Sequence, residues 1–134
     1  MSGLVIKLGP KERILINGAV IENGDRRSRF TVLSSKANIL RLKDAIHPDE
    51  ANSPVKRACC LAQLILSGDI GFSEASPKLA KQIEILDTVF QRPEVKQELN
   101  VATLELEREN AYGCLRALRK ILPVEEKLLS MGQR

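Results

Sequence analysis

The apolar residues of this chain change their spacing near residue 50. Before that point, short runs of β-prone residues are separated by turn sequences, and after it apolar residues recur every three or four positions. Side chains alternate between faces along a strand but return to one face every 3.6 residues in a helix. The sequence therefore predicts an α+β protein, with a small antiparallel β-sheet over residues 1–50 and a region of about three helices over residues 51–134.

The first part of the chain contains four or five candidate strands. The apolar runs cover residues 4–8, 13–16, 19–21, 28–33 and 37–42. Asn17-Gly18 stands between the second and third runs, and this dipeptide is the strongest short hairpin signal because both residues tolerate a positive φ. Asn23-Gly24 repeats the signal one strand later. We therefore expect an antiparallel meander.

Helix signals follow a linker around residues 47–53. Ser53 suits an N-cap and Pro54 suits the first helical position, so the first helix should end at Gly68. The second helix, introduced by residues 73–77, carries one apolar stripe formed by Leu79, Ile83, Leu86 and Phe90.

Pro93 opens the third and longest predicted helix, residues 94–122. Its heptad seam contains one charged residue, Arg108, and six apolar residues: Val101, Leu104, Ala111, Leu115, Leu118 and Leu122. A straight helix of this length spans about 43 Å, more than the roughly 36 Å diameter of a compact chain of this size. The helix should therefore protrude, break or pack against a second subunit. The seam either packs on the chain's own helices or mediates dimerisation or binding of a helical partner.

Cations gather in one window without acids. The net charge is only +4, but six cations and no acid lie between Asp25 and Asp44: Arg26, Arg27, Arg29, Lys36, Arg41 and Lys43. Strand alternation places the cations of residues 27–33 opposite Phe30 and those of residues 39–43 opposite Leu40. These cations are either solvated positions on a half-buried sheet or a surface that contacts nucleic acid through arginine and lysine.

Other classes of function find little support in the sequence. His47 is the only histidine, and no nucleophile motif stands beside it, so we expect no enzyme. Cys59, Cys60 and Cys114 lack the spacing of a zinc site and predict buried reduced thiols. The longest uncharged stretch, residues 58–68, is too short to span a bilayer. We therefore expect a cytoplasmic protein with no catalytic residue, metal or cofactor.

Residues 16–27 have the sequence I-N-G-A-V-I-E-N-G-D-R-R, which is long and specific. Further matches follow in order at Ala37-Asn38-Ile39-Leu40-Arg41, Asp44-Ala45-Ile46, Pro48, Glu50-Ala51, Ser53-Pro54 and Arg57. Through these residues the sequence resembles the FlbT family of flagellar biosynthesis regulators.

The resemblance implies a small cytoplasmic regulator from flagellated α-proteobacteria. Members of the family act on flagellin after transcription: they associate with the 5′ untranslated region of flagellin mRNA and change its translation and decay. Repression is the more common label. Under this hypothesis, Arg26, Arg27, Arg29, Arg41 and Lys43 make most of the RNA contacts, Lys36 contributes from a turn, and the seam mediates homo-oligomerisation or binds a helical partner.

A second hypothesis belongs to another class of function. The protein would be a chaperone-like adaptor that holds flagellin or another flagellar protein through its helices, and its effect on flagellin expression would be indirect. An amphipathic helix lying in an apolar groove suits this mode of binding. A third hypothesis is a structural adaptor without any role in RNA binding.

Overall fold

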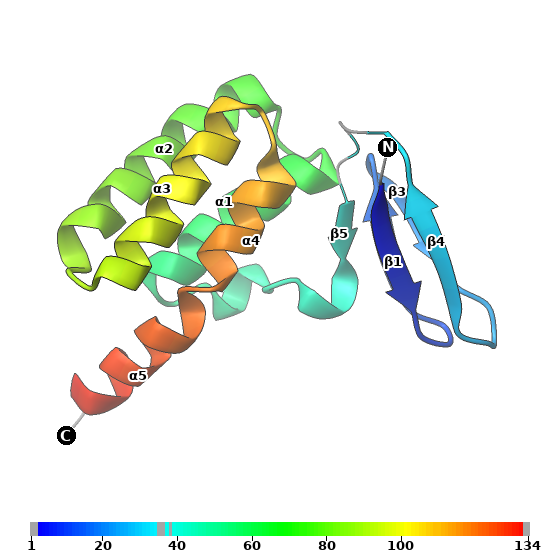
Figure 1. Cartoon of the computed structure of the whole chain (residues 1–134), viewed down its shortest axis with the longest axis horizontal. Coiled ribbons are helices and arrows are strands. Elements are labelled where there is room, and N and C mark those ends of the chain that lie inside the picture. The colour runs from blue at the N-terminus through cyan, green and yellow to red at the C-terminus, as the bar shows by residue number, and fades with distance from the viewer. Residues whose placement is uncertain (1–2, 35–36, 38, 133–134) are drawn as a thin grey trace.

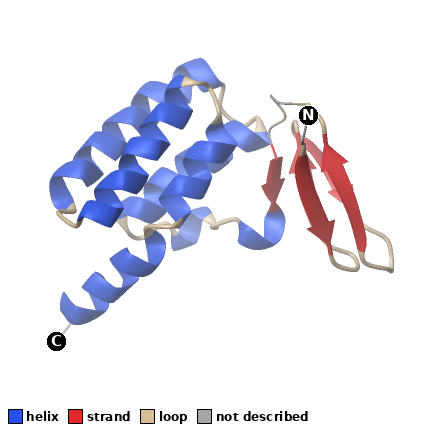
Figure 2. Cartoon of the chain, in the orientation of Figure 1, coloured by secondary structure: helices blue, strands red, loops and turns tan. Residues whose placement is uncertain are grey.

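The computed structural model describes residues 3–34, 37 and 39–132, and it confirms the predicted α+β class. Figure 1 shows the strands gathered at one end of the molecule and the helices at the other, and Figure 2 shows the same division by type of element. The five strands in the described part are β1 (Leu4–Leu8), β2 (Arg13–Ile16), β3 (Ala19–Glu22), β4 (Ser28–Val32) and β5 (Ile39–Arg41).

The strands form two small sheets and not a meander. One sheet pairs β1 with β4, the other has the order β3-β2-β5, and every pair is antiparallel. The predicted hairpin of β2 and β3 is confirmed, because Asn17 and Gly18 have φ values of 50° and 83°. The meander is wrong because β1 does not pair with β2. Instead Ile6 of β1 and Ile14 of β2 bury their side chains in one cluster between the sheets.

Asn23-Gly24 lies where the chain crosses from β3 to β4 and does not form the second tight turn that the sequence predicted. The Asn23 side-chain amide donates to the carbonyl oxygen of Gly9 at 2.7 Å and to that of Arg26 at 2.9 Å. Its Oδ1 accepts a hydrogen bond from the Ser28 hydroxyl at 2.6 Å. This side chain therefore ties the turn after β1 to the segment that carries the first arginines.

Two short 3₁₀ helices, η1 (Leu42–Asp44) and η2 (Pro48–Glu50), lead into the helical part. The helices of the described chain are α1 (Pro54–Ser67), α2 (Phe72–Val89), α3 (Pro93–Glu107), α4 (Ala111–Arg119) and α5 (Leu122–Gly132). The predicted limits of the first helix are confirmed. Ser53 Oγ accepts from the Lys56 amide, and Gly68 ends the helix with a φ of 84°.

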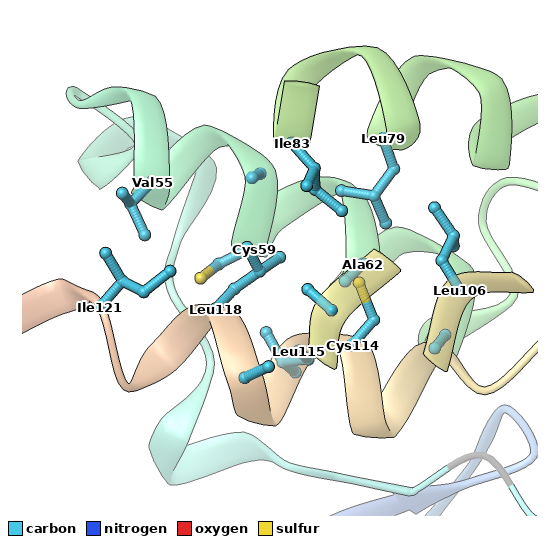
Figure 3. Packing of buried hydrophobic residues seen from close by; sticks show 14 of the residues in the cluster. Val55, Cys59, Ala62, Leu79, Ile83, Leu106, Cys114, Leu115, Leu118 and Ile121 are labelled. Carbon is cyan, nitrogen blue, oxygen red and sulfur yellow. The ribbon is translucent and has the colours of Figure 1, made fainter. Parts of the chain in front are cut away.

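Buried residues from α1, α2, α3 and α4 build most of the main core, and Leu122 and Val124 of α5 pack against it. The stripe predicted for the second helix is confirmed, since its four members are buried in this core. Figure 3 shows how α1 and α4 meet: Cys59 and Ala62 lie beside Leu115 and Leu118, and Leu79 reaches in from α2. Cys59 and Cys114 are buried free thiols, as predicted, whereas Cys60 is half-buried.

The predicted continuous helix over residues 94–122 is wrong. The chain leaves α3 after Glu107, Glu109 adopts a positive φ of 59°, and α4 packs back on α3. Asn110 then caps α4, because its Oδ1 accepts from the Gly113 amide at 3.0 Å. Of the outcomes foreseen for so long a helix, breaking is the one that occurs.

A buried carboxylate joins α5 to the start of α1. Glu125 is only 5% exposed, and its two carboxylate oxygens accept hydrogen bonds from the Ser53 hydroxyl and, at 2.9 Å, from the Val55 amide. The amide groups at a helix N-terminus favour a negative charge. Beyond Glu125, residues 126–131 of α5 are exposed. Figure 1 shows this helix projecting from the bundle.

Strand β5 connects the two parts of the molecule. Its neighbouring residues Ile39 and Leu40 are both buried, but Ile39 belongs to the cluster between the sheets and Leu40 to the helical core. Figure 1 shows β5 between the bundle and the other strands. The third residue of this strand, Arg41, stands at the edge of the cleft described next.

Candidate nucleic-acid interface

Five cations line one cleft of about 460 Å³ at the end of the sheets: Lys7, Arg27, Arg29, Arg41 and Lys43. They come from β1, β4, β5 and the segments that border these strands. Glu12, at the start of β2, is the acidic residue of the same lining. Four of the six predicted RNA-contacting residues are therefore brought together in one place.

Lys7 and Arg29 lie directly opposite each other in the β1–β4 pair. Alternation along each strand turns Ile6 and Phe30 toward the cluster between the sheets and leaves Lys7 and Arg29 exposed. The predicted orientation of Arg29 is therefore confirmed. Like charges at directly opposite positions destabilise a sheet, and in the described part of the chain no carboxylate forms an ion pair with either residue. This pair is costly for folding unless an anion approaches it.

Glu12 organises the floor of the cleft. Its Oε1 accepts from the Gly9 amide at 2.9 Å, and its two oxygens accept from Arg41 Nε at 2.8 Å and Nη2 at 2.9 Å. The Gly9 hydrogen bond, and after it the Arg41 guanidinium, lower the pKa of Glu12, while its partial burial acts in the opposite direction. Glu12 is therefore a satisfied carboxylate near neutral pH.

Arg41 has a different setting from the one predicted. It is already bound to Glu12, and its Nη2 also donates to the Lys7 carbonyl oxygen at 2.7 Å. Both faces of β5 are covered, and the strand ends at Arg41, so Lys43 lies on η1 and not on a shared strand face. Lys43 Nζ stands 3.9 Å from Glu12 Oε2. We conclude that Arg41 holds the cleft together, while Lys43 extends its charge.

The remaining cation predictions have separate outcomes. Arg26 is exposed but does not line the cleft, and Lys36 lies outside the described residues. Sequence analysis missed Lys7, because it stands before the acid-free window. The signal that finds it is the register of β1 against β4, which residue spacing along the chain does not contain.

The six predicted partner residues do not form one surface. Ala111, Leu115 and Leu118 are buried in the chain's own core, and Leu122 is half-buried against it. Val101 and Leu104 are 38% and 50% exposed. The seam is divided because α4 folds back on α3. A role for Val101 and Leu104 in homo-oligomerisation stays a prediction.

An apolar groove of about 550 Å³ runs between β5 and α1. Leu40, Leu42, Ile46, Leu61 and Leu64 provide most of its apolar lining, and Arg57 and Asp69 are its charged members. Residue spacing along the chain contains no separate signal for this groove, because its walls come from elements that meet only in the folded chain.

The other chemistry of the described residues is sparse. No three His, Cys, Asp or Glu side chains among them are grouped to hold a metal ion. Burial raises the pKa of Cys59 and Cys114 to about 12, so these thiols are not nucleophiles. His47 caps η2 by accepting from the Asp49 amide at 3.1 Å. No helix in the described part is long and apolar enough to cross a membrane.

The fold and the cleft define a small α+β protein with a basic site suited to anions. The chain belongs to the FlbT family, since the family model described as "Flagellar protein FlbT" matches residues 4–129. The resemblance inferred from the sequence is thereby confirmed. No solved structure matches the chain.

Similar proteins come from several bacteria. The "Flagellum biosynthesis repressor protein FlbT" of Caulobacter vibrioides is 29% identical over 126 residues, which cover 94% of this chain and 89% of that protein. Proteins named "Probable flagellum biosynthesis repressor protein FlbT" occur in Rhodopseudomonas palustris (34% identical; 95% of this chain and 98% of that protein) and Agrobacterium fabrum (31%; 96% and 85%).

Proposed function

We propose that this chain represses flagellum biosynthesis by acting on flagellin mRNA in the cytoplasm. It binds the 5′ untranslated region of the message and changes its translation and stability. The names of its relatives support the repressor role, and the basic cleft supports direct contact with RNA.

The Lys7–Arg29 pair is the observation that carries the RNA proposal. These two cations are direct partners on neighbouring strands, and Arg27 and Lys43 line the same cleft. RNA phosphates relieve the repulsion among these side chains and release bound counterions as they do so. Arginine adds planar donors that match phosphate oxygens. Arg41 contributes indirectly, because Glu12 keeps its guanidinium in place.

Fluorescence anisotropy with a flagellin leader RNA tests this proposal. The affinity is measured against a shuffled RNA over a salt series, and four to six phosphate contacts give a log–log slope of roughly −3 to −4. The variant Arg27→Ala/Arg29→Ala should weaken binding at least tenfold and reduce the slope by about 1.4.

A matched control removes two cations from the helical part. Lys78 and Lys81 are exposed on α2, far along the chain from the cleft. Lys78→Ala/Lys81→Ala changes the net charge by the same amount and should leave leader binding within about twofold. Equal losses in the two variants, or equal binding of leader and shuffled RNA, would contradict a leader-specific cleft.

The apolar groove favours a second candidate function, in which the chain holds an amphipathic helix of flagellin or another flagellar protein. Leu42 lines this groove and is 37% exposed, so Leu42→Asp should abolish capture of purified flagellin without unfolding the chain. Val89→Asp on α2, where Val89 is 59% exposed outside the groove, is the control. Unchanged flagellin capture by Leu42→Asp excludes the groove as the binding site.

A further inference from the structure

In the described strands and turns, the unpaired positive charge is gathered in one cleft and does not continue along the surface of the sheets. Two other cations of this region are already neutralised, because Lys11 pairs with Asp25 at 3.0 Å and Arg13 with Glu22 at 2.9 Å. Of the described residues that line the cleft, five are cations and one, Glu12, is a carboxylate, which leaves a net charge of +4. Apart from exposed Arg26, the described strands and turns offer no second group of unpaired cations along which a strand of RNA would continue.

A net charge of +4 is concentrated in a cleft of about 460 Å³. Each internal nucleotide brings one negative charge, and successive phosphates are separated along the backbone. A 5′-triphosphate concentrates a charge of about −4 in three linked groups, because its terminal phosphate carries about −2 and each inner one −1. The concentrated charge of the cleft therefore matches a triphosphate better than the separated phosphates of a passing strand.

The donor groups also suit a triphosphate. Arg27 and Arg29 are separated by one residue, so their guanidinium groups can bind two phosphates with planar pairs of donors. Lys7 and Lys43 add compact charges from the neighbouring elements. Among the described residues, no aromatic side chain lines the cleft on which a base would stack, so the cleft contacts phosphate groups and not the faces of bases.

We propose that this cleft holds the 5′-triphosphate of a primary transcript, so that the protein engages a leader RNA from its first nucleotide. This inference rests on the proposed function, since it specifies which part of the RNA occupies the site. It adds a chemical requirement, namely that removing the terminal phosphates weakens binding even when the RNA sequence is unchanged.

The test uses one leader oligonucleotide prepared with a 5′-triphosphate, a 5′-monophosphate or a 5′-hydroxyl group. We expect the affinity of the full chain to fall at least tenfold from the triphosphate to the hydroxyl form, with the monophosphate between them. In Arg29→Ala the three forms should bind within about twofold of one another. Thermal unfolding checks that this variant folds, which is expected because Arg29 is exposed.

Competition distinguishes the possible sources of the triphosphate. Inorganic tripolyphosphate should displace the triphosphorylated RNA from the cleft. If free GTP binds as tightly as the triphosphorylated RNA, the ligand is a nucleotide and the transcript assignment is overturned.

The two proposals fail in different ways. Equal affinity for all three 5′ ends, together with a preference for the leader that Arg27→Ala/Arg29→Ala removes, overturns end recognition and leaves the RNA-binding function intact. Absence of binding to every RNA overturns both proposals.

Discussion

The helical bundle and the two sheets differ in how many residues they bury in their cores. Within the described chain, the main core contains 22 buried residues, nearly all from helices, whereas the cluster between the sheets contains four: Ile6, Leu8, Ile14 and Ile39. The sheets nevertheless carry the cleft with its unpaired cations. The comparison teaches that this chain places its electrostatically unfavourable site on the part with the smaller core, and the bundle supplies stability that the sheets lack.

The largest expected effect comes from the bundle. Leu118 of α4 is fully buried where this helix packs on α1, so Leu118→Ala should lower the free energy of unfolding by about 2–5 kcal/mol. Urea unfolding followed by circular dichroism measures the change. Leu104→Ala is the control and should cost less than about 1 kcal/mol, because Leu104 is half exposed. An equally large, concentration-dependent loss for Leu104→Ala would mean that a second copy covers it.

Glu125 should give the next largest effect. Glu125→Ala leaves the Ser53 hydroxyl and the Val55 amide without their acceptors, which should cost about 1–3 kcal/mol. Urea unfolding measures this loss too, and the exposed neighbour Glu126→Ala is the control. Equal stability of the two variants would show that water replaces the buried carboxylate.

Glu12 should make the stability of the protein depend on acid pH. Its pKa is lowered in the folded state from the ordinary value of 4.5, so its contribution is complete above that value and is lost as the pH falls through the folded-state pKa. Glu12→Gln should lose about 1–3 kcal/mol at pH 7 and show a weaker decline on acidification. Unfolding curves between pH 7 and pH 3 test this, and parallel declines in both proteins would contradict it.

Replacing Arg29 should weaken RNA binding without lowering the free energy of unfolding. Arg29→Ala removes a like-charge pair with Lys7, so its free energy of unfolding should stay equal or rise by about 0.2–1 kcal/mol while leader RNA binding weakens. A melting curve and an anisotropy titration on the same sample measure both effects. A clear loss of stability would mean that Arg29 has a structural role.

The smallest expected effect is a difference in reactivity among the three thiols, and this prediction involves no change in the free energy of unfolding. Cys60 is half-buried, whereas Cys59 and Cys114 are fully buried with pKa values raised to about 12. Iodoacetamide should therefore modify Cys60 first under native conditions, as peptide mass analysis can show. Modification of all three at one rate would indicate that the bundle opens readily.

Local signals predicted the elements well. The Asn17-Gly18 turn, the Ser53 cap and the buried stripe of α2 were all evident, because each depends on neighbours within a few residues. A break in the long helix was only one of three expected outcomes, and its position after α3 was not predicted. The heptad spacing of residues 101–122 suits one long helix as well as two short ones, and only the positive φ of Glu109 and the Asn110 cap decide between them.

The candidate site was predicted in part for a similar reason. Charge along the chain identified Arg27, Arg29, Arg41 and Lys43, which do line one cleft. It could not identify Lys7, or the role of Glu12 in holding Arg41, because these contacts join residues 22 to 29 positions apart through the pairing of strands. Strand partners are set by burial between the sheets, and the sequence contains no local signal for that choice.

Strand β5 makes the molecule one thermodynamic unit. Adjacent residues of this strand, Ile39 and Leu40, are enclosed by different cores, and the next residue, Arg41, holds Glu12. Neither half can unfold without pulling this strand out of the other, so the two should melt in a single cooperative transition. By linkage, an anion that binds only the folded cleft must raise the melting temperature of helices that it never touches. The ellipticity of the bundle thus becomes a reporter of events on the sheets.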